Sequence, residues 1–181
     1  MFVRGEKKMK IISVANRKGG VGKTTTTINI ATALSAIGRK VLVIDFDPQG
    51  NATTSMGIAK QKENYSSYDV LIGKCDVKEA VLHTDLPRFD MIPSSPDLAA
   101  AEIELVEVEK REFVLKKALS NLTSVYDYVL IDCPPSLNLI TINALVSSDS
   151  VMVPLQCEFL ALEGLADLMK NTYALRETGE K

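Results

Sequence analysis

The sequence lacks the features of several protein classes. Its 181 residues contain no uninterrupted apolar run near the ~18 residues that a membrane-spanning helix needs, and the N-terminus is too polar for a secretory leader. These absences predict a cytoplasmic protein that does not act at a membrane. The net charge is −2, so no bulk electrostatic attraction to DNA or to an anionic membrane is expected. Any basic patch must be local.

Residues that bind metals or take part in redox chemistry are also scarce. The three cysteines, Cys75, Cys133 and Cys157, lie far apart without CxxC spacing, which argues against a zinc site or a disulfide framework. We interpret Cys133 and Cys157 as small apolar residues in or near strands. The single histidine, His83, lies in a polar stretch, and we assign it no catalytic role.

Hydrophobic residues make up 46% of the chain, enough for one substantial core, and the length predicts one domain. We place that domain at residues 10–181, after an N-terminal extension at 1–9. Short β-branched runs alternate with segments of helical periodicity, which predicts an α/β fold with a mostly parallel sheet and helices on both faces. The expected strands are 10–15, 41–44, 89–92, 128–131 and 150–155, and the expected helices are 24–37, 96–108, 111–122, 137–146 and 161–175.

A glycine-rich segment joins the first expected strand to the first expected helix. Glycines let backbone N–H groups approach an anion closely, and the start of a helix adds the positive end of its dipole. We therefore predict a phosphate-binding loop, in which Lys23 contacts the β- and γ-phosphates and the Thr24 hydroxyl ligates Mg²⁺. The residues of this loop are Lys18, Gly19, Gly20, Val21, Gly22, Lys23, Thr24 and Thr25.

Carboxylates follow two of the expected strands, at the edge where open parallel sheets bind their ligands. Asp132 ends an apolar strand, so its carboxylate is expected beside Mg²⁺ and the waters of that ion. Asp45 leaves the neighbouring strand in the same direction. Asp47 opens the segment 47–51, whose turn-forming residues explain it without a function. We expect Asp47 to face a different way, and its role stays open.

The phosphate-binding loop departs from the general pattern Gly-x4-Gly-Lys-Ser/Thr at one position, because Arg17 stands where the first glycine is expected. Lys18 instead precedes two glycines, which is the deviant Walker A motif. Three further segments go with this motif: VLVIDFDPQGNAT at 41–53, YVLIDCPPS at 128–136, and VPLQCE at 153–158 with LEG at 162–164. With them, residues from about 10 to 173 resemble the ParA partition ATPases, a branch of the deviant Walker A class that also contains MinD.

This resemblance implies a P-loop NTPase-like fold and a slow, partner-stimulated ATP hydrolase that uses ATP and Mg²⁺. It implies that Asp45 orients or deprotonates the attacking water and that Thr25 contacts the α-phosphate. Lys18 would contact the nucleotide of a second chain, so that two ATP molecules are sandwiched in a homodimer that hydrolysis releases. The implied partners are a ParB-like centromere-binding protein and nonspecific DNA, with association to the nucleoid if DNA binding is retained.

Two other functions stay open. A MinD-like membrane-positioning ATPase would need a basic amphipathic C-terminal helix, and the end of this chain has few paired basic residues; segment 47–51 also resembles the partition branch. The second open function is that of a non-catalytic interaction module. Family members continue past the position of Lys181 into strands and helices that this chain is expected to lack, and their loss would weaken nucleotide binding. The acidic run Glu102, Glu104, Glu107 and Glu109 is read as a solvated helix face, with a docking surface as its alternative.

Overall fold

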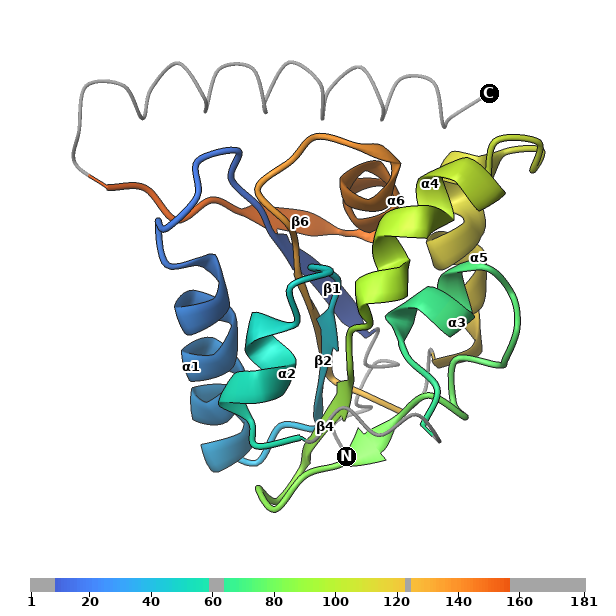
Figure 1. Ribbon diagram of the computed structural model, residues 1–181. Coiled ribbons are helices and arrows are strands. Elements are labelled where there is room, and N and C mark those ends of the chain that lie inside the picture. Colours follow the sequence, from blue (N-terminus) through green and yellow to red (C-terminus); the bar gives the residue numbers. More distant parts are fainter. Residues whose placement is uncertain (1–8, 59–63, 123–124, 157–181) are drawn as a thin grey trace.

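A six-stranded sheet forms the centre of the computed structural model, which describes residues 9–58, 64–122 and 125–156. The strands are ordered β3-β4-β2-β5-β1-β6 across the sheet (Figure 1). All neighbouring pairs are parallel except β3 and β4, which are antiparallel. The strands are β1 (Lys10–Val14), β2 (Val41–Asp45), β3 (Leu82–His83), β4 (Phe89–Ile92), β5 (Tyr128–Asp132) and β6 (Ser150–Met152).

The apolar strands are buried on both faces, as expected for a parallel sheet between two layers of helices. In β2, Leu42 and Ile44 belong to one hydrophobic cluster, and Val41 and Val43 belong to a second cluster. Successive side chains of a strand point to opposite faces, so the two clusters lie on opposite faces of the sheet. This arrangement explains why the whole of β2 is apolar up to Asp45.

Helices cover both faces of the sheet, as predicted (Figure 1). Helices α1 and α2 contribute to the cluster that contains Val41, whereas α3, α4, α5 and α6 contribute to the cluster that contains Leu42. The α-helices are α1 (Lys23–Ala36), α2 (Asn51–Ser55), α3 (Ser67–Leu71), α4 (Ala101–Glu104), α5 (Val114–Leu119) and α6 (Leu139–Ser147), and the 3-10 turns are η1 (Pro96–Ala100), η2 (Arg111–Phe113) and η3 (Ser120–Leu122).

Two short helices and one strand were not expected from the sequence. Helices α2 and α3 have five residues each, too few to show a helical period, and α2 begins at the last residue of the turn-forming segment 47–51. A capping box in which Ser66 and Asp69 satisfy each other's backbone N–H groups starts α3. The two-residue strand β3 is likewise too short for a sequence pattern.

The expected helix at 96–108 is wrong in its extent. Pro96 begins a 3-10 turn, and α4 ends at Glu104. The segment is anchored by Leu98, Ala101 and Leu105, whose side chains are buried in the core. The strand expected at 150–155 ends at Met152. The helix expected at 161–175 lies outside the described residues.

The first helix has the expected ends. Gly38 follows it with φ +84°, a conformation that favours glycine, and its N–H donates to the carbonyl of Ser35 at 2.9 Å. Among the described residues, no helix combines the length and the apolar character that a membrane span requires.

Candidate functional site

The glycine-rich loop lies between β1 and α1, at the carboxyl end of the sheet. Gly20 and Gly22 have φ of +72° and +88°, in the left-handed region where a side chain is strained. Gly22 is the N-cap of α1, so its conformation sets the direction in which the 14-residue helix leaves the loop. The first turn of a helix has backbone N–H groups without an intrahelical partner, so the start of α1 next to this loop suits an anion.

Lys23 is the first residue of α1 and is almost fully buried. Its ammonium donates to the carbonyl of Lys18 at 3.2 Å, so the side chain folds back over the loop. Burial lowers the pKa of Lys23, and the negative charges of Asp132 and Asp47 oppose this effect. A buried cation beside the start of a helix provides the charge that phosphate oxygens need.

Thr24 and Asp132 are in direct contact, as expected for two ligands of one ion. The Thr24 hydroxyl donates to Asp132 Oδ2 at 2.7 Å, and the Thr27 hydroxyl donates to Asp132 Oδ1 at 3.3 Å. Asp132 lies at the end of β5, opposite Val14 of β1, and is 1% exposed. Burial raises the pKa of Asp132 to about 7, the Thr24 hydrogen bond opposes this, and the charge of Asp45 adds to it.

The oxygen atoms of this pair fit a hard cation. Mg²⁺ is bound through one or two protein oxygens and keeps its remaining positions for waters and substrate phosphates. The described part of the chain contains no group of three or more His, Cys, Asp or Glu side chains that could enclose a metal by themselves. The donor set at Thr24 and Asp132 therefore suits an ion that arrives with a nucleotide.

Asp45 has a structural task in addition to its predicted catalytic one. It is fully buried, and its Oδ2 accepts from both the backbone N–H and the hydroxyl of Thr53 at 2.7 Å. Its Oδ1 accepts from the N–H of Asp47 at 3.3 Å. Burial raises the pKa of Asp45, against these hydrogen bonds. The carboxylate thus ties the end of β2 to α2, and its catalytic assignment stays a prediction.

The expectation that Asp47 faces a different way stays a prediction. The negative charge of Asp47 opposes the lowering of the Lys23 pKa, so Asp47 lies within electrostatic range of Lys23. Asp47 Oδ1 accepts from the N–H of Gln49 at 3.0 Å, and the residue is 9% exposed.

The segment after β6 holds the loop from the other side. The Asn16 amide donates to the carbonyl of Pro154 at 2.8 Å, and the Gln156 amide donates to the carbonyl of Gly20 at 3.4 Å. Lys18 is exposed, and its ammonium donates to Gln156 Oε1 at 3.5 Å. Neither Asn16 nor Gln156 was assigned a role from the sequence.

The remaining predicted positions are also placed by the structure. Val21 is buried, whereas Gly19 and Thr25 are exposed on the loop and on the first turn of α1. Cys133 is buried in the core as a free thiol, in line with its apolar interpretation, and burial raises its pKa. Cys157, Glu158 and the segment 162–164 lie outside the described residues.

The loop, Lys23 and the Thr24–Asp132 pair at the edge of a mostly parallel sheet define a P-loop nucleotide-binding protein. The chain matches the family model described as an AAA domain over residues 9–181. Within that class it belongs to the ParA/Soj-type partitioning ATPases, as its relatives show. The sporulation initiation inhibitor protein Soj of Bacillus subtilis is 52% identical over 166 residues, which are 92% of this chain and 65% of Soj.

Two other proteins are similar to this chain over most of its length. The chromosome partitioning protein ParA of Caulobacter vibrioides is 50% identical over 170 residues, covering 93% of this chain and 64% of that protein. A solved structure titled cobyrinic acid a,c-diamide synthase from Mycobacterium smegmatis, with bound ATP analog and magnesium, superposes with a TM-score of 0.88 at 41% identity, covering 93% of this chain and 69% of that one. This chain spans less than two thirds of the length of the two curated relatives.

Proposed function

We propose that this chain binds ATP with Mg²⁺ and hydrolyses it as the switch of a DNA-segregation system. The observation that carries the proposal is the 2.7 Å hydrogen bond between Thr24 and Asp132 beside the buried Lys23. Lys23 would leave the carbonyl of Lys18 and contact the β- and γ-phosphates, while loop N–H groups hold their oxygens. Thr24 and Asp132 would hold Mg²⁺, which neutralises phosphate charge when bound. Thr25 would contact the α-phosphate.

The attacking water requires a carboxylate that can reach the γ-phosphate. The sequence resemblance assigns this role to Asp45, but both oxygens of Asp45 already accept hydrogen bonds in the protein interior. Asp47 lies within electrostatic reach of Lys23, and at least one of its oxygens is engaged by a backbone N–H. We therefore propose Asp47 as the residue that orients the water, with Asp45 as its support.

These two assignments are separable by experiment. Asp47→Asn should bind ATP like the parent chain and lose most of its hydrolysis, without lowering the free energy of unfolding. Asp45→Asn should lower it, because each Asp45 oxygen accepts from a backbone N–H and the amide nitrogen of asparagine would face one of these donors. If Asp47→Asn hydrolysed ATP at the parent rate, Asp45 would regain the catalytic role.

The switch itself rests on Lys18. This exposed lysine lies beside the loop but is not needed by a nucleotide already held by Lys23. We propose that it contacts the nucleotide of a second chain, so that ATP holds a homodimer together and hydrolysis releases it. A ParB-like centromere-binding protein would accelerate this slow step, and nonspecific DNA would be the surface on which it occurs, in the cytoplasm at the nucleoid. The name of the Caulobacter relative, a chromosome partitioning protein, supports the role in DNA segregation.

The domain proposal follows from the same comparison. We propose that residues 10–181 form one ATPase domain that shares its loop, sheet and metal ligands with the relatives, which extend further.

Light-scattering mass measurements test the dimer. With Mg-ATP, an Asp47→Asn chain should be a dimer, because it retains nucleotide without hydrolysing it. A Lys18→Ala/Asp47→Asn chain should remain a monomer and still bind a fluorescent ATP analogue. A monomer under all conditions, with nucleotide bound, would favour an interaction module over a sandwich switch.

A further inference from the structure

Residues 97–109 form an acidic ridge outside the nucleotide site, made of η1, α4 and the turn that follows. The ridge contains no lysine or arginine. Its carboxylates are those of Asp97, Glu102, Glu104, Glu107 and Glu109. A negative charge of this density on one short segment repels anions and attracts cationic groups.

Part of the ridge is also apolar and exposed. Ile103, Val106 and Val108 are 78%, 58% and 41% exposed, whereas Leu98 and Leu105 of the same segment are buried in the core. The buried leucines explain how the ridge packs on the sheet. They do not explain three exposed aliphatic side chains within six residues, since isolated exposed apolar residues are common but clusters mark interaction sites.

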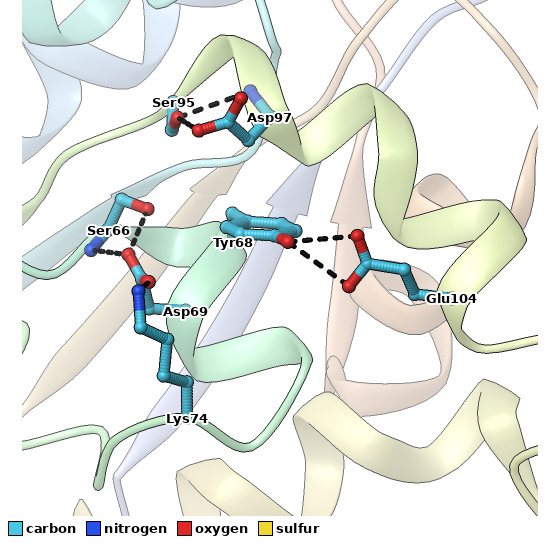
Figure 2. Close-up of polar contacts among 7 residues, drawn as sticks. All are labelled: Ser66, Tyr68, Asp69, Lys74, Ser95, Asp97 and Glu104. Carbon is cyan, nitrogen blue, oxygen red and sulfur yellow. Dashed lines mark hydrogen bonds and ion pairs between the residues drawn. The ribbon is translucent and has the colours of Figure 1, made fainter.

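Two carboxylates of the ridge, those of Glu104 and Asp97, are held by hydrogen bonds. The Tyr68 hydroxyl from α3 donates to both oxygens of Glu104, at 2.9 and 3.1 Å (Figure 2). The Ser95 hydroxyl donates to Asp97 Oδ2 at 3.1 Å. The hydrogen bond with Glu104 raises the pKa of Tyr68, so the phenol stays protonated as a donor. Side chains that are already ordered lose little entropy when a partner binds.

One oxygen in the ridge lacks a donor. Glu102 Oε1 is shielded from solvent and has no hydrogen-bond partner among the described residues. Arg111, which lies two residues after the ridge, donates to the carbonyl of Val106 at 3.4 Å. A buried carboxylate oxygen without a donor is unfavourable, and cations paired with the neighbouring carboxylates would reduce that cost.

We propose that the ridge is a docking surface for a basic amphipathic segment of a partner protein. Aliphatic side chains of the partner would cover Ile103, Val106 and Val108, and its lysines or arginines would pair with Glu104 and the neighbouring carboxylates. Charge complementarity favours this occupant over a second ridge, because two acidic surfaces repel. No residue of the nucleotide site takes part, so the inference does not depend on the proposed function.

A labelled peptide of leucine and lysine in a helical amphipathic pattern tests the surface, by fluorescence anisotropy without nucleotide. Ile103→Ser/Val106→Ser and Glu104→Gln/Glu107→Gln should each weaken binding roughly tenfold or more. Ile37→Ser is the matched apolar control, because Ile37 is 71% exposed at the end of α1. Asp85→Asn is the charge control. Neither control should change the affinity for the peptide. Amide exchange should slow within 97–109 when the peptide binds.

Several results would overturn the proposal. One is that the parent chain does not bind the leucine–lysine peptide, and another is that the control variants lose as much affinity as the ridge variants. A leucine–glutamate peptide that binds as tightly as the leucine–lysine peptide would also contradict the proposal. A parent dimer in light scattering that the ridge variants convert to a monomer would identify the occupant as a second copy. Urea unfolding of each variant shows that it is folded, so lost binding cannot be mistaken for lost structure.

Discussion

Replacing Asp132 with asparagine should make the nucleotide-free protein more stable at pH 8. Asp132 is 1% exposed, and burial raises its pKa from the ordinary value of 3.8 to about 7. This difference corresponds to about 4 kcal/mol that the ionised carboxylate costs the folded state. Asparagine removes the charge and keeps an oxygen that can accept from Thr24.

The pH dependence has a definite sign. Because the folded-state pKa is raised, the contribution of Asp132 to stability is fully present below 3.8 and is lost as the pH rises through about 7. The parent chain should therefore lose roughly 2–3 kcal/mol relative to Asp132→Asn between pH 5 and pH 8. Other titrating groups are largely common to both proteins and cancel in the comparison.

Urea unfolding in EDTA at the two pH values provides the measurement. Asp85→Asn, which changes an exposed carboxylate in a loop, should follow the parent at both pH values. Mg²⁺ with ATP should restore stability to the parent chain at pH 8 but not to Asp132→Asn. If the stability difference between parent and Asp132→Asn were the same at pH 5 and pH 8, the charge of Asp132 would not be what destabilises the folded parent chain.

Three further predictions concern the framework of the site and the sheet. Gly22→Ala should lower the free energy of unfolding by about 1–2 kcal/mol because φ is +88°, whereas Gly19→Ala, which meets no atom within 4 Å and has no positive φ, should change it little. Thr53→Val should cost about 1–3 kcal/mol by removing a hydroxyl that donates to Asp45 and accepts from Ser94, with Thr54→Val as its control. Tyr126→Phe should cost a similar ~1–3 kcal/mol by leaving buried Asp90 without its 2.8 Å donor, and Tyr65→Phe at an exposed position should not. Denaturant unfolding measures all three, and a cost equal to that of the control contradicts the corresponding hydrogen bond or strain.

The elements that the sequence predicted well are those with a long repeating pattern. The strands at 41–44 and 128–131 are continuous apolar runs, and the helix at 24–37 begins at a glycine loop and ends before Gly38, so their bounds differ from the structure by about one residue. Helices α2 and α3 could not be predicted in this way. They depend on contacts made after folding, such as the one between Asp45 and Thr53.

The site shows the same limit. The sequence placed Lys23, Thr24 and Asp132 at one edge because each follows a strand or begins a helix, and the structure brings all three together. It assigned the attacking water to Asp45 and left the role of Asp47 open, because side-chain direction after the end of a strand depends on the turn. The contacts of Asn16 and Gln156 are long-range and leave no local pattern.

The charges of the site explain why it should need a ligand. The negative charges of Asp132 and Asp47 act on the buried ammonium of Lys23. The charge of Asp132 is itself costly, first because the residue is buried and second because Asp45 and Asp47 repel it. The hydrogen bonds from Thr24 and Thr27 offset this cost only in part, since the pKa of Asp132 remains raised. A divalent cation at Thr24 and Asp132 would remove it, and the phosphates that accompany the ion would give Lys23 a stronger partner than the carbonyl of Lys18. The charges that reduce the stability of the nucleotide-free protein are thus the same charges that would make Mg-nucleotide binding favourable.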